Sequence, residues 1–386
     1  MKRNIKLIIL FLLSSLVLCS CGRSQGLTKK QKLEDFEYMC KIVSENHPAL
    51  SASNVASNWD QLQKDYKDKV KKAETDEDFQ VLLSNMLQTL HDPNTLMISN
   101  KNYAQSKTMF QNNEFWGKEF ESDKVVARYK SSEDLLTQGN TTSQPSENIL
   151  TEKVTPYKQN FNVDYIKISR FDVSNGENDM KKIKDFVANT ESTKLLIDLR
   201  NTSQGSDLYW TKYLAPTLFK KEMKWSTYNL YRDGDYLSSF IDSIKEKKSI
   251  AQLDPKTVPS VPKDSLPGFD YFLESTSNIV SKNPINFNGK IYILVSTSMG
   301  SSAVNFSKFV QQNKVGKLVG ELNPNPSMES YLSAASLPNS GYIFVFPASL
   351  IKDSFDIKCF TPDILEKGLP TPKLSIDNCV NATVTD

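Results

Sequence analysis

Short apolar runs alternate with stretches of helical spacing along the second half of this chain, and this alternation constrains the fold more than any other feature. The predicted strands are Val163–Ile168, Lys194–Leu199, Lys290–Val295, Lys317–Gly320 and Tyr342–Phe346. Between them, apolar residues recur at steps of three and four, as in Met180, Ile183 and Val187. Near-continuous apolar strands separated by helices are typical of a sheet that is buried on both faces. We therefore predict an α/β fold.

The first hundred residues predict helices instead. Leu33, Phe36, Cys40 and Val43 lie on one helical face, and this helix should end at His47–Pro48. A second helix should begin at the capping box Thr75–Asp78, in which Asp takes the usual place of Glu. These patterns predict an N-terminal helical subdomain over residues 31–99.

The N-terminus has the features of an export signal. Basic residues precede the apolar stretch Leu7–Leu18, which is too short to span a bilayer comfortably. The stretch ends in Leu18-Cys-Ser-Cys21, which resembles a bacterial lipobox that is cleaved before Cys21. A plain secretory signal is the alternative, but no A-x-A cleavage site is present. We predict a lipoprotein signal peptide over 1–20, a tether over 21–30, and a lipid anchor on the extracytoplasmic face of the cell membrane.

Further boundaries follow from composition. Residues 100–155 form a variable connecting region, within which Gln138–Ser146 is rich in polar residues and predicts an exposed loop. Residues 156–386 hold the α/β part. This part carries an insertion near 235–285, in which the proline-rich residues 250–270 predict an insertion or lid.

Composition excludes several function classes. The chain has 386 residues and a net charge of +2, without the basic footprint of a nucleic-acid-binding protein. It has two histidines and no CxxC, so we expect neither a metal nor a cofactor. Outside the cytoplasm Cys359 and Cys379 could form a disulfide, but with Cys40 the three thiols cannot all pair.

Two turns carry residues suited to catalysis. Ser301 and Ser302 begin the helix after Lys290–Val295, where unsatisfied N–H groups favour an oxyanion, although a serine at this place can also be only a helix cap. The turn Asp198–Ser206 follows another strand and could supply further N–H groups. Alternatively it is a solvated loop in which Asp198 and Arg200 pair.

Eight segments, in this order, resemble the tail-specific, C-terminal-processing serine protease family, in its shorter branch related to the tricorn core and to retinoid-binding repeats. They are Asn46–Pro48, Leu90–Thr95, Val163–Phe171, Leu195–Arg200, Ile291–Phe306, Leu318–Glu321, Leu337–Gly341 and Thr361–Asp363. The resemblance implies a crotonase/ClpP-like spiral core of strands and helices as the catalytic-fold domain over 156–386. It also implies peptide or protein substrates. No PDZ insert is evident in residues 100–155.

The same resemblance assigns roles to individual residues. Ser302 takes the position of the nucleophile, and the N–H groups of Ala303 and Gly205 take the positions of the oxyanion donors. Two positions depart from the family pattern: Asn305 stands where Glu is usual, and Gln204 replaces the first of two glycines.

The residue at the position of the general base departs most clearly from the family pattern. Asn94 occupies the position of the family's base histidine, and an amide is not basic near neutral pH. The lysine of the longer branch is also missing after Glu321. His91 lies three residues before Asn94 and is either a relocated base or a surface or capping residue.

Three hypotheses follow. The chain is a membrane-anchored serine-type peptidase that acylates Ser302, or a non-catalytic relative that binds peptides or a small ligand in the retained cleft. A substrate-binding lipoprotein of a transporter explains the lipobox but none of the internal segments.

Overall fold

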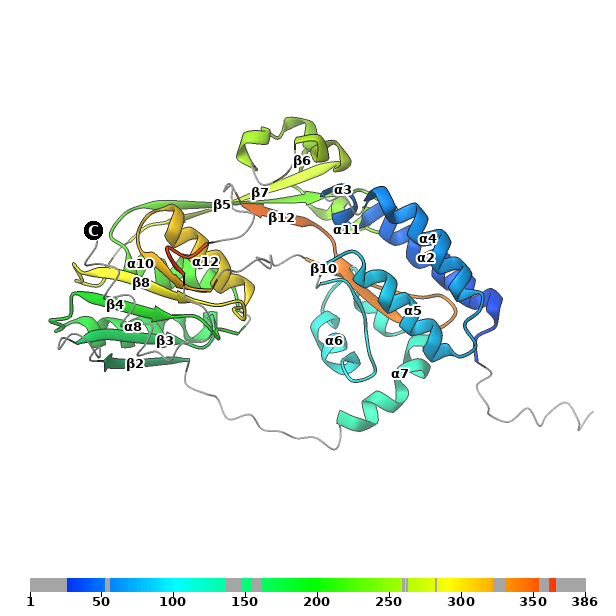
Figure 1. The fold of residues 1–386 in the computed structure, drawn as a ribbon, viewed down its shortest axis with the longest axis horizontal. Helices are drawn as coiled ribbons and strands as arrows, with labels where there is room; N and C mark the ends of the chain where they lie inside the picture. The colour runs from blue at the N-terminus through cyan, green and yellow to red at the C-terminus, as the bar shows by residue number, and fades with distance from the viewer. Residues whose placement is uncertain are drawn as a thin grey trace, which may run out of the picture.

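The computed structural model describes residues 26–52, 56–92, 94–136, 148–154, 162–203, 205–258, 261, 263–281, 283–321, 331–353 and 361–365. Cys21, the loop Gln138–Ser146, Gln204, Cys359 and Cys379 lie outside these residues. Figure 1 shows two groups of elements, a helical unit and a unit built on a sheet, with long strands running between them. No helix within the described ranges combines the length and the apolar character needed to cross a bilayer.

The helical unit contains the helices predicted from the N-terminal patterns. Its elements are α2 (Lys29–Asn46), α3 (Ala49–Ala52), α4 (Ala56–Val70), α5 (Asp76–Gln88), α6 (Tyr103–Phe110), the 3-10 helix η1 (Gly117–Phe120) and α7 (Asp123–Leu136). His47 is the C-cap of α2, as predicted. The predicted capping box at Thr75 is also confirmed, because Thr75 and Asp78 exchange side-chain-to-backbone hydrogen bonds.

A small antiparallel sheet completes the helical unit. Its strand order is β1 (Leu96–Met97), β11 (Ile343–Pro347) and β10 (Leu332–Ser336). The strand predicted at Tyr342–Phe346 therefore exists, but it does not join the main sheet. Its buried aromatic residues Phe344 and Phe346 pack in one apolar cluster with residues of α2 and α5. Burial against these helices places the strand in the first unit.

The predicted α/β core is a six-stranded sheet. Its order is β13 (Ile364–Leu365), β9 (Lys317–Gly320), β8 (Lys290–Val295), β4 (Lys194–Asp198), β3 (Val163–Ile168) and β2 (Ile149–Val154). Only the β2–β3 pair is antiparallel. Helix α8 (Gly176–Val187) connects β3 to β4, and α12 (Ser301–Gln312) connects β8 to β9. Apolar side chains lie on both faces, in a large cluster that includes Ile197 and Ile293 and in a smaller one that includes Leu196 and Leu294.

A second antiparallel sheet runs between the two units (Figure 1). Its order is β12 (Leu350–Asp353), β5 (Met223–Tyr231), β7 (Tyr271–Ile279) and β6 (Lys248–Ser249). At one end of β5, Met223 and Trp225 are buried in the large cluster of the six-stranded sheet. At the other end, Tyr231 is buried among the helices of the first unit. One strand thus contributes to the apolar cores of both units.

The proline-rich insertion packs on this second sheet. It contains the helix α11 (Ser238–Ser243) and the 3-10 helices η4 (Ile250–Gln252), η5 (Pro255–Thr257) and η6 (Lys263–Gly268). Val258, Leu266 and Phe269 form a separate apolar cluster with β5 and β7 residues. The Ser51 hydroxyl of α3 donates a hydrogen bond to the Gly268 carbonyl oxygen at 2.7 Å. The insertion is therefore anchored to the helical unit.

Candidate active site

The two turns that sequence reasoning selected meet at one edge of the six-stranded sheet. Strands β4 and β8 are parallel neighbours, so their carboxyl ends lie at the same edge. The N–H of Gly300 donates to the Thr202 carbonyl oxygen at 2.8 Å. The Ser296 hydroxyl donates to the Arg200 carbonyl oxygen. Direct backbone bonding therefore holds the start of α12 against the 199–207 turn.

Ser302 lies in the first turn of α12 and its hydroxyl faces the other turn. Its Oγ donates a hydrogen bond to the Gly205 carbonyl oxygen at 2.9 Å. The residue is 1 % exposed, so the hydroxyl lies beneath the surface in this conformation. The structure brings together Ser302 and Gly205, two of the residues that the sequence selected.

One of the two predicted oxyanion donors, the Ala303 N–H, is already in use in this conformation. The Ala303 N–H donates to the Gly300 carbonyl oxygen at 3.1 Å, inside the first turn of the helix. Gly205 presents its carbonyl oxygen, and not its N–H, to the Ser302 hydroxyl. An oxyanion needs donors aimed at the position where its charge develops. This conformation must therefore rearrange locally before it can hold one.

Glycine is required at position 205 by a close approach of the backbone. A Cβ atom at this residue would lie 2.5 Å from the Phe171 carbonyl oxygen and 2.7 Å from the Phe171 Cβ. The neighbouring Ser206 N–H donates to the same carbonyl at 3.0 Å. The turn is thus pressed against the segment that follows β3, and any side chain at residue 205 would push it away.

Asp198 and Arg200 form a buried pair at the start of the turn. The carboxylate accepts from Arg200 at 2.7 Å and from the Tyr165 hydroxyl at 2.6 Å. Burial raises the pKa of Asp198, but the hydrogen bonds from Arg200 and Tyr165 outweigh it and hold the pKa below its ordinary value. The pairing of Asp198 with Arg200 is therefore a structural brace of the turn.

Asn305 lies one helical turn after Ser302 and contacts the other turn as well. Its amide Nδ2 donates to the Asp207 carboxylate at 3.0 Å, and Asp207 also accepts from the Trp210 indole at 2.8 Å. The amide Oδ1 of Asn305 is buried and has no hydrogen-bond partner among the residues that the structure describes. This contact adds a side-chain link between α12 and α9 (Asp207–Tyr209).

The candidate base residues lie in the helical unit. His91 is exposed and has a positive φ of 52°, three residues after the end of α5. Asn94 donates its backbone N–H to Asp92 at 3.1 Å. Within the described residues, the structure brings neither His91 nor Asn94 into hydrogen-bond contact with Ser302.

Sequence reasoning missed a buried polar cluster beside Asn94. The His47 Nε2 lies 2.7 Å from the Thr95 hydroxyl and 3.5 Å from Asp92, and the Thr95 hydroxyl donates to Asp92 at 2.5 Å. The Nδ1 of His47 accepts from the Ala49 N–H at 3.1 Å, so Nε2 carries the proton of the neutral ring. Both ring nitrogens are therefore occupied. His47 and Asp92–Thr95 appear in the sequence as two separate motifs, and no local spacing links them.

Comparisons with known proteins agree with this architecture. Solved structures with the same fold include a candidate peptidase from Parabacteroides merdae, at 15 % identity and TM-score 0.56, covering 92 % of this chain and 96 % of that one. Mature CPAF complexed with lactacystin has 11 % identity and TM-score 0.56, covering 92 % of this chain and 97 % of that one. No curated protein gives a significant sequence match.

Family sequence models match both units. The model of the Tricorn protease C1 domain matches residues 28–88, the part of the helical unit that contains α2 to α5. The model of Peptidase family S41 matches residues 162–342, from β3 through the α12 region to the start of β11. The mixed α/β core with its N-terminal helical region fits both matches. The chain therefore matches peptidase family S41 over residues 162–342, and this match together with the Tricorn C1 match supports membership of that family.

Proposed function

We propose that this protein is a lipid-anchored, extracytoplasmic serine-type peptidase that takes peptide or protein segments and is acylated at Ser302. The contact that carries this proposal is the 2.9 Å hydrogen bond from Ser302 to Gly205. It joins the first turn of α12 to the 199–207 turn, which are the two segments that the family resemblance assigns to the nucleophile and the oxyanion donors. The lipobox ending in Cys21 supports the anchor.

Acylation would proceed from this arrangement in two movements. Rotation of the Gly205–Ser206 peptide would turn the Ser206 N–H away from Phe171 and toward Ser302, and the Ala303 N–H would shift from Gly300 to the developing oxyanion. The Ser302 hydroxyl would then attack the substrate carbonyl and give its proton to a base; the C–N bond would break, the amine would leave with that proton, and the acyl group would remain on Ser302. His91 is exposed and would have to approach from the helical unit to accept the Ser302 proton.

A second candidate function is peptide binding without turnover. The amide of Asn94 cannot accept the Ser302 proton near neutral pH. The other histidine, His47, has both ring nitrogens engaged by Ala49 and Thr95. Loss of the base lowers the rate of a serine peptidase by several powers of ten and leaves the groove intact.

Labelling of the purified protein with a fluorophosphonate distinguishes the two functions. The peptidase predicts covalent labelling of the wild-type protein that disappears in Ser302→Ala and persists in the neighbouring control Ser301→Ala. Titration of an unstructured peptide into the same samples measures binding separately. Peptide binding without any covalent label would favour the non-catalytic binding function over the peptidase. Labelling that survives Ser302→Ala would contradict Ser302 as the acylated residue.

A further inference from the structure

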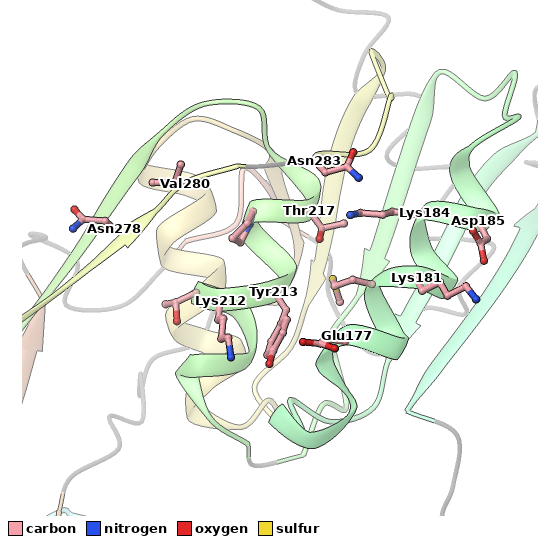
Figure 2. A pocket seen from close by; sticks show the side chains of 13 residues that line it. Glu177, Lys181, Lys184, Asp185, Lys212, Tyr213, Thr217, Asn278, Val280 and Asn283 are labelled. Carbon is pink, nitrogen blue, oxygen red and sulfur yellow. The ribbon is translucent and has the colours of Figure 1, made fainter.

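A concave site in the sheet unit is lined by residues other than Ser302. It is a cavity of about 800 Å³ between α8, the π-helical segment η3 (Trp210–Leu214), α10 (Ala215–Leu218) and the residues that follow β7. Among the residues that the structure describes, none from α12 or from the 199–207 turn lines it. Figure 2 shows the residues that line it, with Lys184, Glu177 and Tyr213 turned toward the space between α8 and the η3–α10 segment.

The local backbone builds this cavity in a specific way. A π-helix is rare and is often found at functional sites. Here it supplies three consecutive lining residues, Thr211, Lys212 and Tyr213. The Tyr213 ring lies on the start of α8, since a Cβ atom at Gly176 would be 2.4 Å from the ring. The close contact between Tyr213 and Gly176 therefore fixes one wall.

Hydrogen bonds fix the opposite wall. The Ser281 hydroxyl donates to the Pro216 carbonyl oxygen at 2.7 Å, and the Ile285 N–H donates to the Thr217 carbonyl oxygen at 2.8 Å. These two bonds hold the segment with Val280 and Asn283 against α10. The cavity is thus enclosed by braced elements on both sides.

The polar groups of the cavity favour a negative group at one end. Lys184 extends from α8 toward Thr217 and Asn283 (Figure 2). Among the residues that the structure describes, no carboxylate lies within ion-pair distance of Lys184. An ammonium, a hydroxyl and a side-chain amide together can donate several hydrogen bonds to a carboxylate.

The other residues that line the cavity restrict which chemical groups the rest of the ligand can carry. Met180 and Pro216 provide apolar wall, and Val280 is 42 % exposed although it is a large apolar residue. At the other end Glu177 points toward Tyr213 (Figure 2), and the Lys212 ammonium lies over the same ring at 4.9 Å, so these two opposite charges offset each other and this end does not call for a second anion. A ligand with one anionic end and an apolar body fits this distribution.

We infer that this cavity binds a small organic monocarboxylate with an apolar body, and that Lys184 holds its carboxylate. A peptide C-terminus and a free alkyl carboxylic acid share this chemistry. N-acetyl-leucine represents the first source and octanoate the second. N-acetyl-leucinamide has nearly the same shape as N-acetyl-leucine but no charge, and it is the matched control ligand.

Isothermal titration calorimetry of the purified protein with these three probes tests the inference. We expect saturable binding of at least one carboxylate, with the tighter one identifying the source, and no binding of N-acetyl-leucinamide. In Lys184→Met the affinity should fall by at least about tenfold, because a charge-assisted contact is lost.

Lys182→Met is the matched control variant, because Lys182 is exposed on the same helix but does not line the cavity. It should leave the affinity unchanged. Equal binding of the amide, full affinity in Lys184→Met, or no saturable binding of either carboxylate at millimolar concentration would overturn the inference. None of these outcomes depends on acylation of Ser302.

Discussion

The Ser302 hydroxyl donates its hydrogen bond to a carbonyl oxygen, that of Gly205, at 2.9 Å. A carbonyl oxygen in this place repels an oxyanion, whereas the N–H of the same turn would stabilise one. The two turns of the candidate site are therefore in contact, but the Gly205 carbonyl oxygen, and not an N–H, faces the Ser302 hydroxyl. The proposed acylation would need rotation of the Gly205–Ser206 peptide, a shift of the Ala303 N–H from Gly300, and a base that reaches Ser302.

Gly205→Ala should destabilise the fold. The added Cβ would lie 2.5 Å from the Phe171 carbonyl oxygen, so the turn must move, at a cost of roughly 1–3 kcal/mol in the free energy of unfolding. Urea unfolding measures this loss. Gly26→Ala is the control, because its Cβ would meet Asp76 at an ordinary 3.5 Å. Equal stability of the two variants would show that the turn yields freely.

Asn94→His should restore a base to the position that the family resemblance assigns. We expect hydrolysis of an unstructured peptide to rise by about a hundredfold or more, the usual contribution of general base catalysis. Asn94→Gln keeps an amide and should show no gain. Adding Ser302→Ala to Asn94→His should remove the gain. If the folded histidine variant hydrolyses no faster than wild type, the assigned position of the base is wrong.

The Asp198–Arg200 pair should make stability depend on pH. Hydrogen bonds from Arg200 and Tyr165 outweigh burial and lower the pKa of folded Asp198 below its unfolded value of about 3.9. The pair therefore stabilises the protein above the unfolded pKa, and this stability is lost as the pH falls through the folded pKa. Wild-type unfolding free energy should thus decline in acid.

Arg200→Met should reverse this trend. Without the guanidinium, burial is opposed only by the hydrogen bonds of the Tyr165 hydroxyl and the backbone N–H of residue 200, so the pKa of Asp198 should rise, and loss of the paired charge should cost roughly 3–5 kcal/mol at neutral pH. The variant should recover stability as the pH falls through the raised pKa of Asp198, because the protonated carboxyl is no longer a buried charge. The double variant Asp198→Asn, Arg200→Met should lack this recovery. Parallel pH profiles for wild type and Arg200→Met would refute the account.

Cys40 should be unreactive in the folded protein. Burial, with a smaller effect of the Glu37 carboxylate, raises the pKa of its thiol to about 12. Little thiolate is present near pH 8, and the thiolate is the nucleophile. Mass spectrometry after iodoacetamide treatment should find Cys40 unmodified in the native protein and alkylated in urea. Rapid native alkylation would mean that the contact between α2 and α4 opens readily.

Cys21→Ser should release the protein from membranes, because the predicted lipid would have no attachment site. Fractionation of cells that express the full chain measures this change. Cys359→Ser is the control and should remain in the membrane fraction. A Cys21→Ser variant that stays with the membrane would exclude the lipid anchor.

Local patterns predicted much of the fold. Val163–Ile168 and Lys290–Val295 form strands with the predicted bounds, because apolar runs of this kind need burial on both faces. The Thr75 capping box also formed where its residues predict it. Tyr342–Phe346 was placed wrongly, since its partner β1 lies more than two hundred residues earlier. Its own sequence does not encode that pairing.

The candidate site was predictable only in part. The parallel pairing of β4 and β8 explains why Ser302 and Gly205 meet, and the sequence supplied both residues. The orientation of the Gly205 peptide depends on Phe171 and on the start of α12, so no local pattern reveals it. The His47–Thr95 contact joins residues that are 48 positions apart in the sequence, so only the folded structure reveals it.

Strand β5 begins in the core of the sheet unit and ends, at Tyr231, in the core of the helical unit. An N-terminal fragment that ends before Met223 would lack Tyr231, so the helical unit would lose one of its buried aromatic rings. A fragment that starts at β2 would keep the strand but expose Tyr231 to water. Removing either unit would expose apolar surface that is buried in the intact chain. We therefore expect the two units to unfold in one cooperative transition.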